Sequence, residues 1–211
     1  MRELFYRSFE RFLTLERTSI LNNVSERNLC HRLGFCLEEE RRMAGFDGYY
    51  VDAEYNRQQN GQIKTIIDEH AHEISITCDL ILHSRGENIR NDNLIAIEMK
   101  KSDQPKSDKD EDRIRLRALT KQSYDNVWFN DGVTPPRYVC GYQLGLFIEV
   151  NVRTGRIMVE EFESGNIVNG REFRLKQRVV RKAAPRSLKR RKETVPPGTL
   201  VLRKPNDMSN A

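Results

Sequence analysis

Residues 78–103, CDLILHSRGENIRNDNLIAIEMKKSD, contain two apolar runs separated by a polar loop, and each run holds an acid. Asp79 lies in the first run, and Glu98 lies in the second, two residues before Lys100. Short runs of this kind indicate β-strands, in which successive side chains point to opposite faces. We therefore predict a hairpin that places charged side chains within an apolar sheet.

The expected strands, over about residues 73–83 and 94–100, put these charges on one face of the sheet. Glu98 and Lys100 share a face about 7 Å apart along their strand. If His83 pairs with Leu94, antiparallel pairing keeps the sum of paired residue numbers constant and sets Asp79 opposite Glu98. A slip of the loop by one or two residues would change that pairing. Opposed like charges are destabilising without a counter-ion, so the pair needs a cation.

A third acid, Glu26, lies at the start of a helix that we expect to begin after Asn23 or Ser25 and to end near Met43. The helix has one apolar stripe, and Glu26 precedes its first members, Leu29 and Cys30, by three and four residues. Glu26 should therefore point towards the core. By itself it is better explained as a first-turn acid favoured by the helix dipole than as a catalytic residue.

The remaining pattern gives the order helix, three strands, helix, strand, strand. Further strands are expected at YYVDAEYN, YQLGLFIEVN and GRIMVEEF, and a helix at KDEDRIRLRALTKQSYDNVW. A chain of 211 residues has the length of one α/β domain. We divide it into an N-terminal amphipathic helix in residues 1–20, a domain in residues 21–170 and a basic tail in residues 171–211.

The tail carries eleven Lys or Arg residues against one acid between Arg171 and Lys192, in a chain of net charge +5. Such a strip can neutralise phosphates, so it is a candidate for binding nucleic acid; a solubilising tail is the alternative. The candidate binding residues are Arg181, Lys182, Arg186, Lys189, Arg190, Arg191 and Lys192.

The composition favours a cytoplasmic protein without a membrane segment. No window approaches 18 consecutive apolar residues, and the charged N-terminus lacks the apolar core of a signal peptide. The four cysteines are scattered and form no C-x-x-C pair, which is typical of reduced thiols rather than of disulfides or a zinc site.

An acid on the first core helix, an Asp on one strand and a Glu-x-Lys on the next form a known constellation. Here they are Glu26 in SERNLCHRL, Asp79 in CDLILH, and Glu98 with Lys100 in IEMKK. With the element order helix-strand-strand-strand-helix-strand, residues 24–163 resemble the PD-(D/E)XK nuclease superfamily.

Two features depart from that family's pattern. Cys78 stands where many members have a proline before the aspartate, a position that varies within the family. The helix after the Glu-x-Lys strand has Gln122 and Tyr124 at the wrong spacing for the Gln-x-x-x-Tyr arrangement of exonuclease-like members. This second departure argues against assignment to the exonuclease-like branch.

The resemblance implies a restriction-endonuclease-like α-β-β-β-α-β core, a mixed sheet flanked by helices, and hydrolysis of phosphodiester bonds in nucleic acid, expected to be DNA. It implies Mg²⁺, with Mn²⁺ as a substitute, held by Asp79, Glu98 and the main-chain carbonyl of Met99. Glu26 would bind a second metal or a metal-bound water. Lys100 would orient the attacking water or help to deprotonate it.

The resemblance also implies partners, because such domains often act as subunits of restriction, defence or mobile-element systems. We therefore expect partner protein subunits or a homodimer in addition to nucleic acid. Two alternatives remain open: a module on the same fold that binds nucleic acid or acts as a scaffold without cutting, and a protein-interaction subunit of a larger machine.

Overall fold

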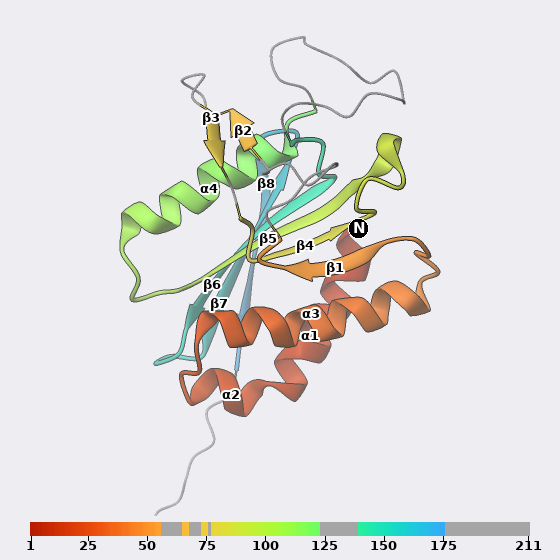
Figure 1. The fold of residues 1–211 in the computed structure, drawn as a ribbon. Coiled ribbons are helices and arrows are strands. Elements are labelled where there is room, and N and C mark those ends of the chain that lie inside the picture. The colour runs from red at the N-terminus through yellow and green to blue at the C-terminus, as the bar shows by residue number, and fades with distance from the viewer. Residues whose placement is uncertain (56–64, 68–72, 76, 123–138, 176–211) are drawn as a thin grey trace, which may run out of the picture. The chain divides into compact units, whose positions relative to one another are not determined.

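The structure is a computed structural model that describes residues 1–55, 65–67, 73–75, 77–122 and 139–175 (Figure 1). The described helices are α1 (Arg2–Leu15), α2 (Arg17–Leu21), α3 (Glu26–Met43) and α4 (Lys106–Thr120), with a short 3-10 helix η2 (Ile89–Asn91). The described strands are β1 (Tyr50–Ala53), β2 (Thr65–Ile67), β3 (Glu73–Ser75), β4 (Leu80–His83), β5 (Asn93–Lys101), β6 (Leu144–Asn151), β7 (Arg156–Glu163) and β8 (Asn166–Arg174).

Six strands form one mixed open sheet in the order β1-β4-β5-β6-β7-β8. Strands β5 and β6 are parallel and are joined through α4, whereas the other neighbours are antiparallel. Strands β2 and β3 form a separate two-stranded sheet. The expected α/β class, with a mixed sheet flanked by helices, is confirmed.

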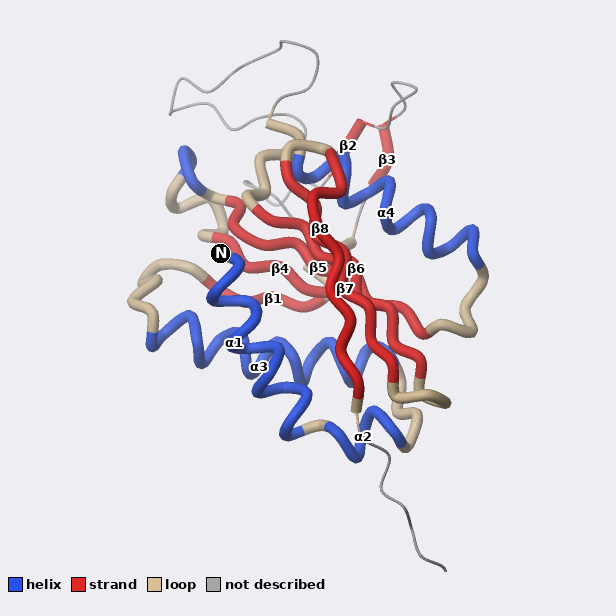
Figure 2. The backbone as a smooth tube through the Cα atoms, turned by 180° about the vertical axis from the view of Figure 1, so that it is seen from behind, coloured by secondary structure: helices blue, strands red, loops and turns tan. Residues whose placement is uncertain are grey.

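The helices cover both faces of the sheet (Figures 1 and 2). Helices α1 and α3 pack on one face, where Phe5, Phe9 and Leu33 join Ile97 and Met99 of β5 in a buried cluster. Helix α4 packs on the other face, through a second cluster. The apolar stripes of these helices are what the sheet buries. Strand β5 is thus covered on both sides, and its charged residues lie near its C-terminal end.

The β4–β5 hairpin has the expected register over most of its length. Leu80 pairs with Ile97 and Leu82 with Ile95. The two residue numbers of each pair add up to the same total as 79 and 98, so this register places Asp79 opposite Glu98. The register shifts after Leu82, so that His83 pairs with Asn93. The prediction that His83 pairs with Leu94 is therefore wrong, because a bulge at the loop end absorbs one residue.

The strand expected over residues 73–83 is also wrong as a single element. Its first part, β3, pairs with β2 in the small sheet, and β4 begins only at Leu80. Asp79 lies in a bend immediately before β4 rather than in the middle of a strand. Its side chain can therefore turn towards the end of β5, instead of standing perpendicular to the sheet.

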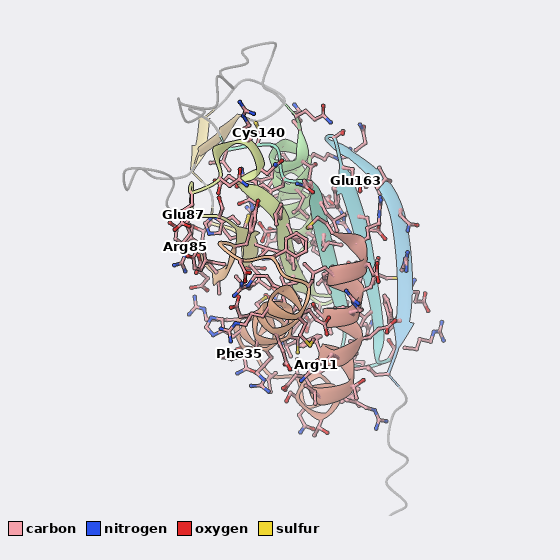
Figure 3. All side chains as sticks on the ribbon, turned by 90° about the vertical axis from the view of Figure 1, so that its right-hand side faces the viewer. Arg11, Phe35, Arg85, Glu87, Cys140 and Glu163 are labelled. Atoms are coloured by element: carbon pink, nitrogen blue, oxygen red, sulfur yellow. The ribbon has the colours of Figure 1, made fainter. Side chains whose placement is uncertain are left out.

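Both ends of the chain differ from the expected segmentation in detail. Two helices, α1 and α2, fill residues 2–21, and β8 runs through the expected boundary between residues 170 and 171. Strand β8 is an almost fully exposed edge strand, seen in blue in Figure 3. The candidate nucleic-acid-binding residues Arg181 to Lys192 lie outside the described residues.

None of the helices in the described part of the chain combines the length and the apolar character that a bilayer crossing requires. None of the four cysteines forms a disulfide within the described residues, and Cys30, Cys36 and Cys78 are buried.

Candidate metal and catalytic site

Asp79 lies beside the C-terminal half of β5. Its Oδ2 accepts a hydrogen bond of 2.8 Å from the main-chain N–H of Met99, the residue that follows Glu98. Its own carbonyl accepts a bond from the main-chain N–H of Glu54, just after β1. The bend before β4 is therefore fixed on both sides, and it holds the Asp79 carboxylate next to the Glu-x-Lys motif.

Glu98 is buried, with 1% of its surface exposed, on the face of the sheet that α4 covers. Its Oε1 accepts a 3.0 Å bond from Nε of Arg115 on α4. Burial and then the negative charge of Asp79 raise the pKa of Glu98 to about 8, against the lowering effect of Arg115. A carboxylate in this environment is stabilised by any additional positive charge.

Lys100 contacts a second acid from α4. Its Nζ lies 3.1 Å from Oδ2 of Asp112, which is 1% exposed, and Nη2 of Arg115 donates to the other oxygen of Asp112. Burial acts to lower the pKa of Lys100, but the charges of Asp112 and Asp79 outweigh it and raise that pKa. Lys100 therefore keeps its proton at neutral pH. Glu98, Arg115, Asp112 and Lys100 form one ion-pair chain, which we call the α4 network.

Glu26 approaches the end of β5 from the opposite face of the sheet. It is the first residue of α3, whose N-cap Ser25 accepts a bond from the N–H of Asn28. Oε1 of Glu26 accepts a 2.7 Å bond from the main-chain N–H of Lys101. The Lys101 side chain extends towards the residues just before α3, and its Nζ lies 3.4 Å from the carbonyl of Asn23. The first turn of α3 therefore places Glu26 against the end of β5.

A cavity of about 400 Å³ lies between the start of α3 and the bend before β4. Its lining residues are Ser25, Glu26, Arg27, Cys30, His31, Glu54 and Asp79. Burial raises the pKa of the Cys30 thiol, and the charges of Asp79, Glu98 and Glu26 raise it further, in that order. Asp79 and Glu26 bond to the main-chain N–H groups of Met99 and Lys101, so both lie at the end of β5 that carries Glu98.

Each of the three carboxylates has one oxygen that accepts no hydrogen bond from the described residues. The other oxygen of Asp79, Glu98 and Glu26 is in the hydrogen bond given above. In that same part of the chain, no three Asp, Glu, His or Cys side chains form a group that could hold one metal ion. A cation at Asp79 and Glu98 would need main-chain oxygen or water as further ligands.

These donors fit magnesium. Mg²⁺ prefers oxygen ligands, usually keeps several waters and needs only one or two carboxylates from a protein. The carbonyl of Met99 is a further donor on the correct side, because the N–H and C=O of a strand residue point the same way and the N–H points at Asp79. Of the expected residues, Glu26 lies across the sheet from Glu98, in keeping with a separate or water-mediated role.

Asp112 and Arg115 are members of the site that the sequence did not single out. A signal was present, since Asp112 shares a helical stripe with the buried Leu116 and Leu119 at spacings of four and seven residues. A charged residue within a buried stripe needs a partner inside the protein. Here that partner is the Lys of the Glu-x-Lys motif.

Comparison of the chain with protein-family models, with curated proteins and with solved structures gave no match. The roles of Asp79, Glu98, Lys100 and Glu26 therefore rest on their own contacts and chemistry. Those contacts bring three acids, of which Glu98 is buried, and one protonated lysine to the end of a central strand.

Proposed function

We propose that this chain is a divalent-metal-dependent nuclease that hydrolyses phosphodiester bonds in DNA, built on a restriction-endonuclease-like core. The observation that supports it best is the bond from the Met99 amide to Asp79, which sets that carboxylate beside the Glu98-x-Lys100 pair. The succession α3-β1-β4-β5-α4-β6 around these residues supports the same proposal.

In this proposal Asp79 and Glu98 hold Mg²⁺ or Mn²⁺, with the Met99 carbonyl as a third protein ligand. The ion, when bound, supplies Lewis-acid stabilisation of charge on the attacking and leaving oxygens. Lys100, kept protonated beside Asp112, orients the attacking water and offsets negative charge on the phosphate rather than removing a proton. Glu26 holds a second ion or a water in the cavity that it lines.

A second candidate function is a module on the same fold that binds nucleic acid without cutting it. The observation in its favour is that the α4 network already pairs Glu98 with Arg115 and Lys100 with Asp112. A set of charges satisfied within the protein can serve stability alone. Either function is compatible with a place in a larger restriction, defence or mobile-element complex.

Cleavage of supercoiled and linear DNA with Mg²⁺ or Mn²⁺ separates the two candidates. Asp79→Ala and Lys100→Ala should each lower the cleavage rate at least about 100-fold, because each removes charge stabilisation at the reacting phosphate. Asp108→Ala, an exposed acid in the first turn of α4, is the matched control and should stay within about twofold. Equal activity, or equal inactivity, of wild type and both variants with either metal contradicts the nuclease proposal.

A further inference from the structure

Arg115 joins the two buried acids of the α4 network. Its Nε donates to Oε1 of Glu98, and its Nη2 donates to Oδ1 of Asp112 one helical turn away. The two acids are each 1% exposed, whereas a quarter of the Arg115 side chain remains exposed. A planar guanidinium with several donors is suited to hold two carboxylates at once.

The bond to Glu98 sets Arg115 in competition with a metal ion. Glu98 is buried, and Arg115 is the cation whose Nε lies 3.0 Å from its Oε1. A divalent ion at Glu98 would bring two positive charges to the same carboxylate. Two cations on one buried carboxylate repel each other, so the bond between Arg115 and Glu98 weakens as the ion binds.

Asp112 is a second ion-pair partner that can hold Arg115 when its bond to Glu98 is lost. Arg115 and Asp112 are three residues apart on one helix, so their ion pair needs no movement of α4. The other oxygen of Asp112 is held by Lys100. An Arg115 side chain that leaves Glu98 therefore stays charge-paired, and its partly exposed position leaves room for the movement.

We propose that Arg115 is a built-in counter-ion that competes with the metal: it holds Glu98 in the metal-free protein and passes to Asp112 alone when the metal binds. This inference rests on the proposed function, because it assumes that Glu98 is a metal ligand. It adds a residue that sets the metal concentration at which the site fills.

The test is a titration of the full chain with Mn²⁺ in the absence of DNA. Electron paramagnetic resonance of the free ion measures how much Mn²⁺ is bound. Arg115→Met keeps the aliphatic stem and removes the competing charge, so Mn²⁺ should bind about tenfold or more tightly. Lys106→Met removes one charge from an 89% exposed side chain of the same helix and should change the affinity by less than about twofold. A structural role for Arg115 predicts the opposite sign, a weaker site.

Two further variants keep the outcome decisive. Arg115→Lys retains the charge without the fork that joins two carboxylates, so its Mn²⁺ affinity should lie between those of wild type and Arg115→Met. Glu98→Gln should abolish the binding. If Glu98→Gln abolishes it but both Arg115 variants bind no more tightly than wild type, the inference is overturned and the metal site stands. If no variant binds Mn²⁺, or Glu98→Gln binds it normally, the proposed metal site itself fails.

Discussion

Asp52 in β1 is held by two side chains of the β4–β5 hairpin. Its Oδ2 lies 2.9 Å from Nε2 of His83, and its Oδ1 accepts a 2.6 Å bond from Nη2 of Arg85. Figure 3 shows Arg85 in the hairpin loop, on the side away from β8. Burial raises the pKa of Asp52, but the bonds to His83 and Arg85 outweigh it and lower that pKa below its ordinary value of 3.8.

This lowered pKa has a defined sign in the pH dependence of stability. A carboxyl with a lower pKa in the folded protein stabilises the fold above its unfolded pKa, and that contribution is lost as pH falls through the folded pKa. Asp52→Asn should therefore lower the free energy of unfolding at pH 7 by about 1–3 kcal/mol. The difference from wild type should shrink as pH falls below 3.8.

Urea unfolding at pH 7, 5, 4 and 3 measures that difference. Asp47→Asn removes an exposed acid from the turn between α3 and β1 and serves as the control, with little effect at any of these pH values. A difference between wild type and Asp52→Asn that stays constant from pH 7 to pH 3 would show that the charge of Asp52 does not carry the contribution.

The individual residues of the site were predictable to different degrees. Glu98 and Lys100 stand out because charges at alternate positions interrupt an apolar strand. Asp79 was found from the residue sum of the hairpin, although it lies just outside β4. Arg115 was not found, because a partly exposed arginine on a helix full of charges has no distinguishing pattern. Only the packing of α4 on β5 brings it into contact with Glu98.

At the level of elements, α4 is held against the sheet by a close contact at its C-terminal end. A Cβ on Gly145 of β6 would lie 2.9 Å from Cγ2 of Thr120, the last residue of α4, and 3.1 Å from Cβ of Phe162 on β7. Neither atom is the far end of a flexible side chain. Glycine at position 145 therefore lets α4 approach the strands to which it presents Asp112 and Arg115.

Gly145→Ala should lower the free energy of unfolding by about 1–3 kcal/mol, because the added methyl overpacks this contact. Gly170→Ala in β8 is the matched control, since a Cβ there has only the carbonyl of Val159 within 4 Å, at 3.9 Å, and should cost less than about 0.5 kcal/mol. Equal unfolding midpoints in urea for the two variants would contradict this packing.

The elements were predicted where an apolar period marked them. Strands β5, β6 and β7 lie at their expected places because their buried residues alternate or run together. Strand β8 was missed because nearly all its residues are exposed, so the main-chain pairing with β7 defines it and no apolar pattern does. The separation of β3 from β4 has no apolar signal either, because EISITCDLILH reads as one run.

At the scale of the whole molecule, charge is divided unevenly along the chain. Residues 178–211 contain ten Lys or Arg against two acids, so the first 177 residues have a net negative charge within a total of +5. The first of two units into which the chain divides comprises residues 1–177 and includes β8. Most non-specific attraction to DNA phosphates should therefore come from residues 178–211.

Removing residues 178–211 should lower DNA affinity about tenfold or more at 150 mM salt and make the remaining binding less dependent on salt. The truncated chain keeps β8 and should unfold at the same temperature as wild type. Fluorescence anisotropy of a labelled duplex over a salt series measures the effect. Unchanged affinity and an unchanged salt dependence would make the basic segment a solubilising tail.

Asp79 and Glu98 are proposed to hold one divalent ion at the end of β5. Crystals of the full chain soaked in Mn²⁺ test it most directly, through an anomalous difference map. We expect an ion with oxygen ligands from both carboxylates at about 2.0–2.3 Å, with Arg115 bonded to Asp112 alone. A map in which no ion contacts either carboxylate, while Arg115 remains on Glu98 at saturating Mn²⁺, would contradict it.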